Sequence, residues 1–245
     1  MENGAVIRRR LDLLIRLIDT TTGLAVSSQS VVFKKDGKVL PVRQKGEGNY
    51  IFIDIGRENS FMELSAYGYD PQVITLDYET LDPNLPSIDV FLIPSENTPQ
   101  VRSLTGKVRG LTSVEAVQLG KPVCSISEFE PKDNRMTLFL PNKRMNMEDG
   151  HYGLLHEEKG YEHFVVKEQR SPVSVILTEP LAEEFAVNSP IAQVVFGHVD
   201  EKGNYTLRVL DTAEHPKYLV RFTTADGDRY KVYDFGSDPP VEVKN

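Results

Sequence analysis

Short apolar runs separated by turn-forming residues are the feature that most restricts the fold of this chain. The clearest example is residues 50–70, YIFIDIGRENSFMELSAYGYD, in which the runs 50–55 and 61–65 flank a polar segment containing glycine and asparagine. Five polar or flexible residues between two β-prone runs are typical of a hairpin loop. We therefore expect residues 50–65 to form a β-hairpin and the chain to be rich in β-structure.

The rest of the first 95 residues repeats this pattern. Residues 11–18 (LDLLIRLI) show a mostly period-2 pattern, in which residues 11, 13, 15 and 17 alternate with Asp12, Leu14, Arg16 and Ile18; this favours a strand, with a helix as the alternative. Asp36-Gly37 between two apolar runs is a strong hairpin signal. We expect further strands at residues 27–33, 39–40, 72–78 and 88–93. About seven short strands with a turn at each break predict a β-sandwich over residues 1–95.

A polar segment containing proline, residues 95–100, indicates a domain boundary. Residues 101–245 then predict a second β-rich domain, a sandwich or barrel, without the helix–strand alternation of a parallel sheet. The expected strands are residues 123–127, 135–140, 152–156, 163–167, 174–178, 191–199, 205–210, 218–223 and 228–234. Two pairs form hairpins, around residues 200–204 and at Asp226-Gly227.

Two segments of the second domain predict something other than strands. Thr112-Ser113-Val114-Glu115 has the spacing of a capping box, and Leu119-Gly120 would end a helix of at most two turns. Residues 236–240, GSDPP, should begin a loose C-terminal tail. The fold class expected from the sequence is therefore all-β, with one short helix.

Charge and cysteine content limit the partners and the compartment. A formal net charge of −8 argues against general nucleic-acid binding, and the cationic run Arg8–Arg10 is too short to reverse this conclusion. No apolar run is long enough for a transmembrane helix, and Asp12 and Arg16 interrupt the one stretch that imitates a signal peptide. Cys124 is the single cysteine and lies in an apolar context, as expected for a small buried side chain in a reducing compartment. These features favour a cytoplasmic protein without membrane insertion.

The order of several short motifs in the first domain resembles a known family. Leu17-Ile18-Asp19 and Thr22-Gly23 precede the segments 48–53 (GNYIFI), 64–69 (LSAYGY) and 88–94 (IDVFLIP). This order is similar to that of the carboxypeptidase regulatory-like domains of the transthyretin-like (prealbumin-like) class, over roughly residues 10–94. The resemblance implies a seven-stranded prealbumin-like sandwich. We find no such resemblance for the second domain.

The sequence offers little evidence of catalytic chemistry. His156 and His163 lie seven residues apart with Gly160 between them, which does not fit the spacing of a zinc-binding helix, so a turn between two strands is the better interpretation. No nucleophile elbow and no glycine-rich phosphate loop occur, and we assign no catalytic residue, metal or cofactor. Tyr67, Tyr69 and Tyr78 are the candidate contact residues, with packing between the sheets as the alternative.

These observations favour a non-enzymatic structural or interaction protein. The resemblance and the cytoplasmic character are similar to those of accessory parts of phage tails and phage-tail-like contractile injection particles, which implies other protein subunits as partners and release with an assembled particle. Exposed sheet edges would supply the packing surfaces. The alternative is a carbohydrate- or peptide-binding module that uses the three tyrosines.

Overall fold

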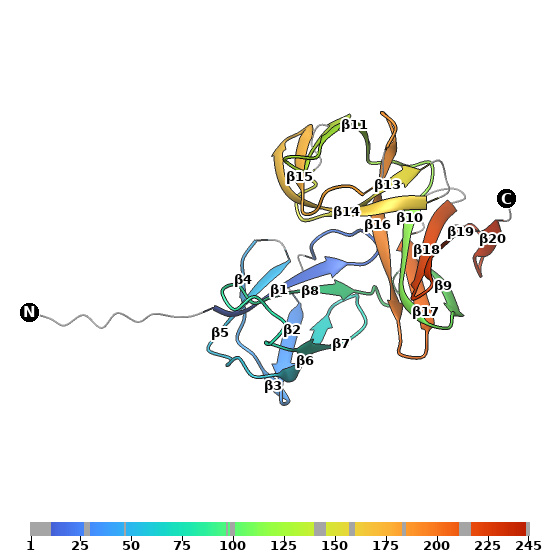
Figure 1. Ribbon diagram of the computed structural model, residues 1–245. Helices are drawn as coiled ribbons and strands as arrows, with labels where there is room; N and C mark the ends of the chain where they lie inside the picture. Colours follow the sequence, from blue (N-terminus) through green and yellow to red (C-terminus); the bar gives the residue numbers. More distant parts are fainter. Residues whose placement is uncertain are drawn as a thin grey trace, which may run out of the picture. The chain divides into compact units, whose positions relative to one another are not determined.

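The computed structural model describes residues 11–26, 30–46, 48–96, 98, 101–139, 146–156, 160–182, 185–210 and 217–243. Arg8–Arg10 lies outside these residues. Every helix or strand within the described ranges is a β-strand, so the all-β prediction is confirmed for them (Figure 1). No described helix could span a membrane.

The chain divides into two compact units, which we describe separately. The first holds the described residues up to Asp19 together with Leu24–Ser95, and the second holds Thr20–Gly23 and the described residues from Glu96 onward. The strands of the first unit are β1 (Leu11–Asp19), β2 (Val31–Lys35), β3 (Lys38–Val39), β4 (Arg43–Gln44), β5 (Asn49–Ile53), β6 (Ser60–Ala66), β7 (Gln72–Leu76) and β8 (Ser87–Leu92).

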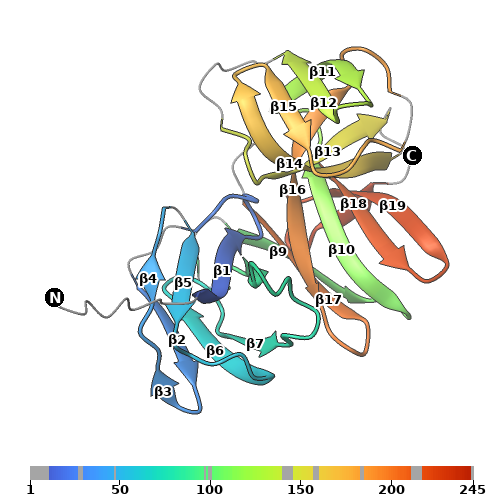
Figure 2. The ribbon, with the colours of Figure 1, turned by 60° about the vertical axis from the view of Figure 1, so that its left-hand side comes forward.

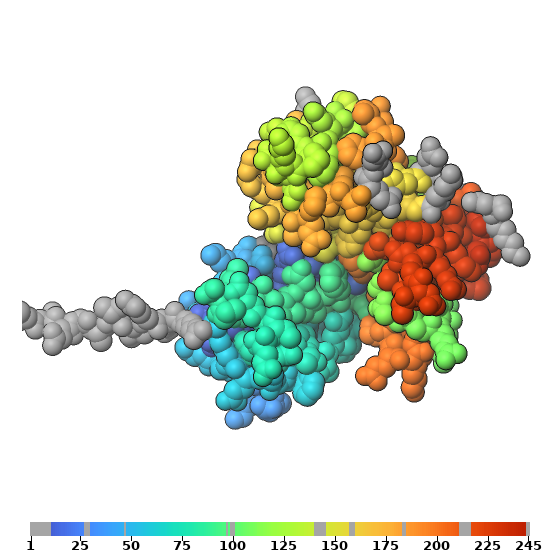
Figure 3. All heavy atoms as spheres, viewed as in Figure 1, coloured from blue at the N-terminus to red at the C-terminus, as the bar shows by residue number. Residues whose placement is uncertain are grey.

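The first unit is a sandwich of two four-stranded sheets. Their strand orders are β4-β5-β1-β8 and β3-β2-β6-β7, and β1 and β8 run parallel. Period-2 alternation sends one face of each sheet inward, as in β6, where Met62 and Leu64 are buried and Phe61 and Glu63 are exposed. Phe33 of one sheet packs against Tyr50 and Phe52 of the other. The inward side chains of both sheets form one apolar core. Figure 3 shows the outer surface of this unit, coloured blue to blue-green.

The hairpin predicted for residues 50–65 is wrong. β5 pairs with β1 and β4, whereas β6 pairs with β2 and β7, so the two runs belong to different sheets. The segment between them crosses from one sheet to the other. The carboxylate of Asp12 accepts a hydrogen bond from the amide of Ile55 at 2.9 Å, and Arg57 donates to the carbonyl of Leu11 at 2.7 Å. These contacts hold the crossing segment against β1 instead of letting it fold back as a hairpin loop.

The second unit contains the remaining strands. They are β9 (Val101–Lys107), β10 (Leu111–Gln118), β11 (Cys124–Glu130), β12 (Arg135–Phe139), β13 (His151–His156), β14 (Gly160–Ser171), β15 (Ser174–Leu177), β16 (Pro190–Val199), β17 (Asn204–Leu210), β18 (Lys217–Thr224), β19 (Gly227–Asp234) and β20 (Val241–Val243).

Six strands of this unit close into an antiparallel barrel. The pairing runs β11-β12-β15-β14-β13-β16 and returns to β11. Closure leaves this part without an open sheet edge. The barrel interior is apolar and includes Ile126, Met136, Tyr152 and Val166.

The long strand β16 connects the barrel to a second, open sheet (Figure 2). Its first residues pair with β11 and β13, and its later residues pair with β10 and β17. The open sheet has the order β9-β17-β16-β10-β18-β19-β20. One of its faces packs on a core that includes Leu207, Val220 and Phe222, and the other packs on Val117, Ala192 and Leu219.

The helix predicted after Thr112 is wrong, because this segment is strand β10. Thr112 donates its hydroxyl proton to the carbonyl of Thr223 at 3.0 Å, and Glu115 bonds to Arg221 on the neighbouring strand β18. The capping-box residues therefore make cross-strand contacts rather than helix caps. Local spacing suggested a helix, but pairing with β16 and β18 on both sides decides the structure.

The predicted loose tail is also partly wrong, since Val241–Val243 form strand β20 and pair with β19. The hairpins predicted at Asp36-Gly37 and around residues 200–204 are confirmed. A hairpin also joins β18 and β19, with Thr224 opposite Gly227, so its two-residue loop is Ala225-Asp226.

Candidate functional site

Two groups of side chains in the described structure are candidates for a functional role. The first is the outer face of the sheet β3-β2-β6-β7. We define it by the exposed residues that share this face through their cross-strand pairing: Val32, Lys34, Val39, Phe61, Glu63, Ser65, Val73 and Thr75. The second is a buried polar cluster in the second unit.

Half of the side chains that define the outer face are apolar: Val32, Val39, Phe61 and Val73. Phe61 and Val73 are each 66% exposed and Val39 is 64% exposed. Lys34 of β2 lies directly opposite Glu63 of β6, which puts one cation and one anion at the centre of the face. The apolar side chains Val39 and Val73 lie on the two sides of this charged pair, and apolar area left exposed on a sheet face is a candidate contact surface for another protein.

The strand at one end of this sheet adds to that surface. β7 is a terminal strand of its sheet, and its residues Gln-Val-Ile-Thr-Leu include neither a charge nor a proline. Natural proteins usually protect such edges with lysine, proline or a bulge. β7 thus leaves an edge that could accept a further strand.

The three predicted tyrosines do not form one contact surface. Tyr67 is 85% exposed in the turn after β6, whereas Tyr69 and Tyr78 are partly buried and pack against the sandwich core. Tyr69 donates its hydroxyl proton to Asp19 at 2.7 Å, and burial followed by the bond to this carboxylate raises the pKa of Tyr69. Burial followed by the charge of Asp12 raises the pKa of Tyr78. Aromatic stacking on a sugar would therefore have to rely on Tyr67.

The polar cluster of the second unit lies across four strands. Glu115 of β10 is 8% exposed and accepts a hydrogen bond from Arg221 of β18 at 2.5 Å. Its Oε2 also lies 3.5 Å from Nδ1 of His163 on β14. Nε2 of His163 in turn lies 3.0 Å from Nδ1 of His151 on β13. The result is a chain of contacts from a guanidinium through a carboxylate to two imidazoles.

Aromatic rings enclose this cluster. The guanidinium of Arg221 lies 5.1 Å from the ring centroid of Tyr161, a cation–π arrangement. Tyr230 meets Tyr161 edge-on at 5.7 Å and donates its hydroxyl proton to the Tyr161 carbonyl at 3.1 Å. His151 packs edge-on against Phe196 at 5.0 Å. The rings limit access of water to the charges, so their mutual attraction is stronger than it would be at an open surface.

The charge on Glu115 is held by its partners. Burial acts to raise the pKa of this carboxyl, but the hydrogen bond and charge of His163, together with Arg221, lower it below its ordinary value. Glu115 is therefore ionised over the whole neutral range. The cluster is a compensated buried ion network rather than an isolated charge.

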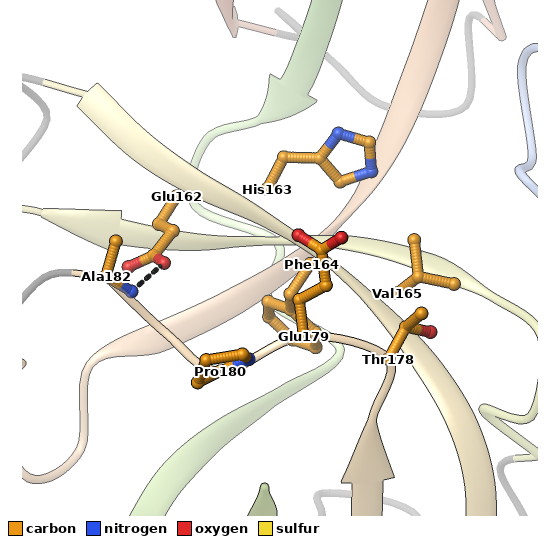
Figure 4. Close-up of a pocket in the computed structure, with 8 residues that line it drawn as sticks. All are labelled: Glu162, His163, Phe164, Val165, Thr178, Glu179, Pro180 and Ala182. Atoms are coloured by element: carbon orange, nitrogen blue, oxygen red, sulfur yellow. Dashed lines mark hydrogen bonds between the residues drawn. The ribbon is translucent and has the colours of Figure 1, made fainter. Parts of the chain in front are cut away.

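A pocket of about 370 Å³ adjoins His163 (Figure 4). Glu162, Glu179 and Thr178 supply polar groups to its lining, and Phe164, Val165 and Pro180 supply apolar groups. Glu162 is engaged with the amide of Ala182, at 2.5 Å. Among the described residues no group of three or more histidine, cysteine or acidic side chains is arranged to hold a metal ion.

The contacts of His163 are a feature that the sequence did not predict. His156 and His163 lie on the paired strands β13 and β14, with His156 opposite Gly160, and the predicted turn at residues 157–159 lies outside the described ranges. The interpretation did not foresee that His163 meets His151, 12 residues earlier, and Glu115. One signal was present: Glu115 lies between Val114 and Ala116, and Arg221 lies between Val220 and Phe222, and charges with apolar neighbours on both sides indicate a buried pair.

Comparisons with known proteins do not show a family for this chain. No family model matches it, and no curated protein matches it. Among solved structures, extracellular domains 3–5 of Drosophila OTK align with 12% identity over 94% of this chain and 98% of that chain, at a TM-score of 0.14. A TM-score this low carries no inference about fold or function.

Proposed function

We propose that this chain is a non-enzymatic interaction protein, an accessory subunit of a multiprotein assembly that docks through the outer face of the sheet β3-β2-β6-β7. The observation that carries the proposal is the exposure of Phe61, Val73 and Val39 on one sheet face beside the unprotected edge strand β7. An isolated protein gains nothing from leaving this area in water, whereas a partner that covers it contributes favourable burial.

The surface also restricts the partner. The central Lys34 and Glu63 would need opposite charges or polar groups facing them, and the surrounding valines and Phe61 would need apolar side chains. A nucleic acid does not offer such a surface, and the chain's net charge of −8 also disfavours one. A protein subunit fits both requirements.

The class of assembly rests on the sequence resemblance. A carboxypeptidase regulatory-like sandwich in a chain with one buried cysteine is similar to the accessory parts of phage tails and phage-tail-like contractile injection particles. Burial raises the pKa of the Cys124 thiol to about 12, which keeps this thiol unreactive. We propose assembly in the cytoplasm, followed by release as part of the particle.

Sedimentation of a native lysate of the source cells tests this function. We expect the chain to migrate with a large complex and to shift to the position of a 27.6 kDa protein when the complex is dissociated by mild denaturant. A single monomer peak in the native lysate, at endogenous protein concentration, would count against the proposal.

A further inference from the structure

Two segments of the first unit carry opposite charge. Residues 34–45 hold one acid and five cations, which are Lys34, Lys35, Lys38, Arg43 and Lys45. Residues 70–86 hold no lysine or arginine and four acids, which are Asp70, Asp77, Glu79 and Asp82. The first segment includes β3 and β4, and the second includes β7.

The strand order places these segments on opposite sides of the sandwich. β3 and β7 are the terminal strands of one sheet, and β4 is a terminal strand of the other. Residues 40–42 connect β3 to β4, so these two strands lie on the same side, which we call the basic side, and β7 lies on the opposite, acidic side (Figure 2). Three strand spacings separate β3 from β7, a distance of roughly 14 Å. Because the screening length at physiological salt is about 8 Å, the two sides neutralise each other little within one molecule.

The cations of the basic side form no ion pairs. Within the described part of the chain none of the five lies in a salt bridge, whereas Arg16 and Arg57 of the same unit each pair with an aspartate. Lys35 and Lys38 lie directly opposite each other on β2 and β3. Like charges in this position destabilise a strand pair, and an anion placed beside them relieves the repulsion. The basic side is therefore suited to an anionic partner.

The acidic side combines its charge with an edge that can accept another strand. β7 is the terminal strand that contains neither a charge nor a proline, and Asp70 and Asp77 come shortly before and after it. Glu79 and Asp82 follow in the connection to β8, and both are exposed. Each molecule thus carries both halves of a complementary pair of surfaces.

We infer that the first unit binds a second copy of this chain head to tail, with the basic side of one copy against the acidic side of the next. Two different surfaces meet in such a contact, so a bound pair still has one basic and one acidic side open, and further copies can add. A nucleic acid could neutralise the basic side and would leave the acidic side unused. The inference rests on the proposed function, since it names the partner at the β7 edge.

Sedimentation of the purified full chain at about 100 μM tests the contact. We expect association at about 50 mM salt that weakens roughly tenfold or more at about 300 mM, because screening reduces attraction between exposed charges. Lys35→Glu with Lys38→Glu should weaken association by a similar factor. The matched control is Lys107→Glu with Arg109→Glu, an equal change in charge at two exposed cations of the second unit, which should have less than about a twofold effect.

A charge-swapped mixture tests whether the partner is a second copy. Glu79→Lys with Asp82→Asn removes most of the negative charge of the acidic side, and the asparagine keeps an oxygen that can accept the amide of Asn84. This variant should self-associate as weakly as Lys35→Glu with Lys38→Glu. A mixture of the two variants should form heterodimers with the wild-type affinity, because the unchanged acidic side of one meets the unchanged basic side of the other.

A wild-type chain that stays monomeric, or a mixture that associates no better than its components, would overturn the inference. If the Lys35 and Lys38 variant does not fold, Arg43→Glu with Lys45→Glu replaces it, since both side chains are exposed. The native lysate separates this outcome from failure of the proposed function. A chain that is monomeric when pure but migrates with a large complex in the lysate keeps the docking function and lacks the self-contact.

Discussion

Tyr69 and Tyr78 both pack against the core of the first unit, but their hydroxyl groups differ in hydrogen bonding. Tyr69 donates to Asp19, whereas the buried hydroxyl of Tyr78 has no hydrogen-bond partner among the described residues. We predict that Tyr69→Phe lowers the free energy of unfolding by about 1–2 kcal/mol, because Asp19 loses a donor. Tyr78→Phe should be neutral or slightly stabilising. Urea unfolding of both variants measures the difference, and equal losses would contradict this assignment.

Glu115 connects the stability of the second unit to pH. Its pKa is lowered in the folded chain, so the unfolded chain binds the proton more readily and stability falls as pH falls. The contribution of its charge is present above the ordinary glutamate value of about 4.3 and is lost as pH falls through the lowered folded value.

We therefore predict that Glu115→Gln costs about 3 kcal/mol at pH 7, because the buried charge of Arg221 loses its nearest anion and keeps only Asp228, at 3.7 Å. The difference between wild type and variant should shrink below about pH 4. Urea unfolding at pH 7, 5 and 3.5 tests this. Glu128→Gln is the control, because this glutamate of strand β11 is exposed, and the substitution should change the free energy of unfolding by less than about 1 kcal/mol. A constant difference between Glu115→Gln and wild type at all three pH values would be inconsistent with a charge effect.

At the scale of elements, the turn before β17 depends on one glycine. Gly203 has φ +75°, and a Cβ built on it would lie 2.2 Å from the carbonyl oxygen of Val108. Gly203→Ala should cost more than 2 kcal/mol, since it adds a backbone clash to the cost of a left-handed conformation. Gly120→Ala, at φ +71° with open space around it, should cost only about 1 kcal/mol. Thermal unfolding of the pair checks the prediction, and similar values would mean that the turn can move away from Val108.

The elements that sequence reasoning could predict are those whose signal is local. The period-2 pattern predicted β1, and Asp36-Gly37 predicted the hairpin of β2 and β3. Both signals come from residues that are neighbours in the sequence. The predictions for residues 50–65 and Thr112–Glu115 were wrong because the structure of these segments depends on strands that are distant in the sequence. The turn residues after β5 fit a hairpin equally well, and the partners of β10 come about 80 and 105 residues later in the sequence.

The same argument applies to the sites. Single tyrosines can be noticed in a sequence, but whether Tyr67 is exposed and Tyr69 packed depends on which sheet face each one joins. The cluster of Glu115, His163 and Arg221 comes from three strands that become neighbours only when the barrel and the open sheet form. Sequence reasoning could flag a charge inside an apolar strand, and could not identify its partner.

At the scale of the whole molecule, we propose that another subunit covers the outer face. The outer face carries exposed Phe61 and Val73, and the barrel carries a chemically matched pair, Phe139 and Val173, at 52% and 46% exposure. The matched pair does not adjoin an open sheet edge, because the barrel is closed. If exposed apolar residues alone drove assembly, substitutions at either pair would have the same effect. If the chain docks through the outer face, only substitutions of Phe61 and Val73 should disrupt assembly.

The most direct measurement compares sedimentation of two double variants in native lysates of the source cells. Phe61→Thr with Val73→Lys should move the chain from the large complex to the monomer position, because it removes apolar area and places a charge on the edge strand. Phe139→Thr with Val173→Lys should leave the chain in the complex. Both variants should stay folded, since each changes exposed side chains, and circular dichroism confirms this. Assembly that persists in the first variant, or is lost equally in both, would contradict docking through the outer face.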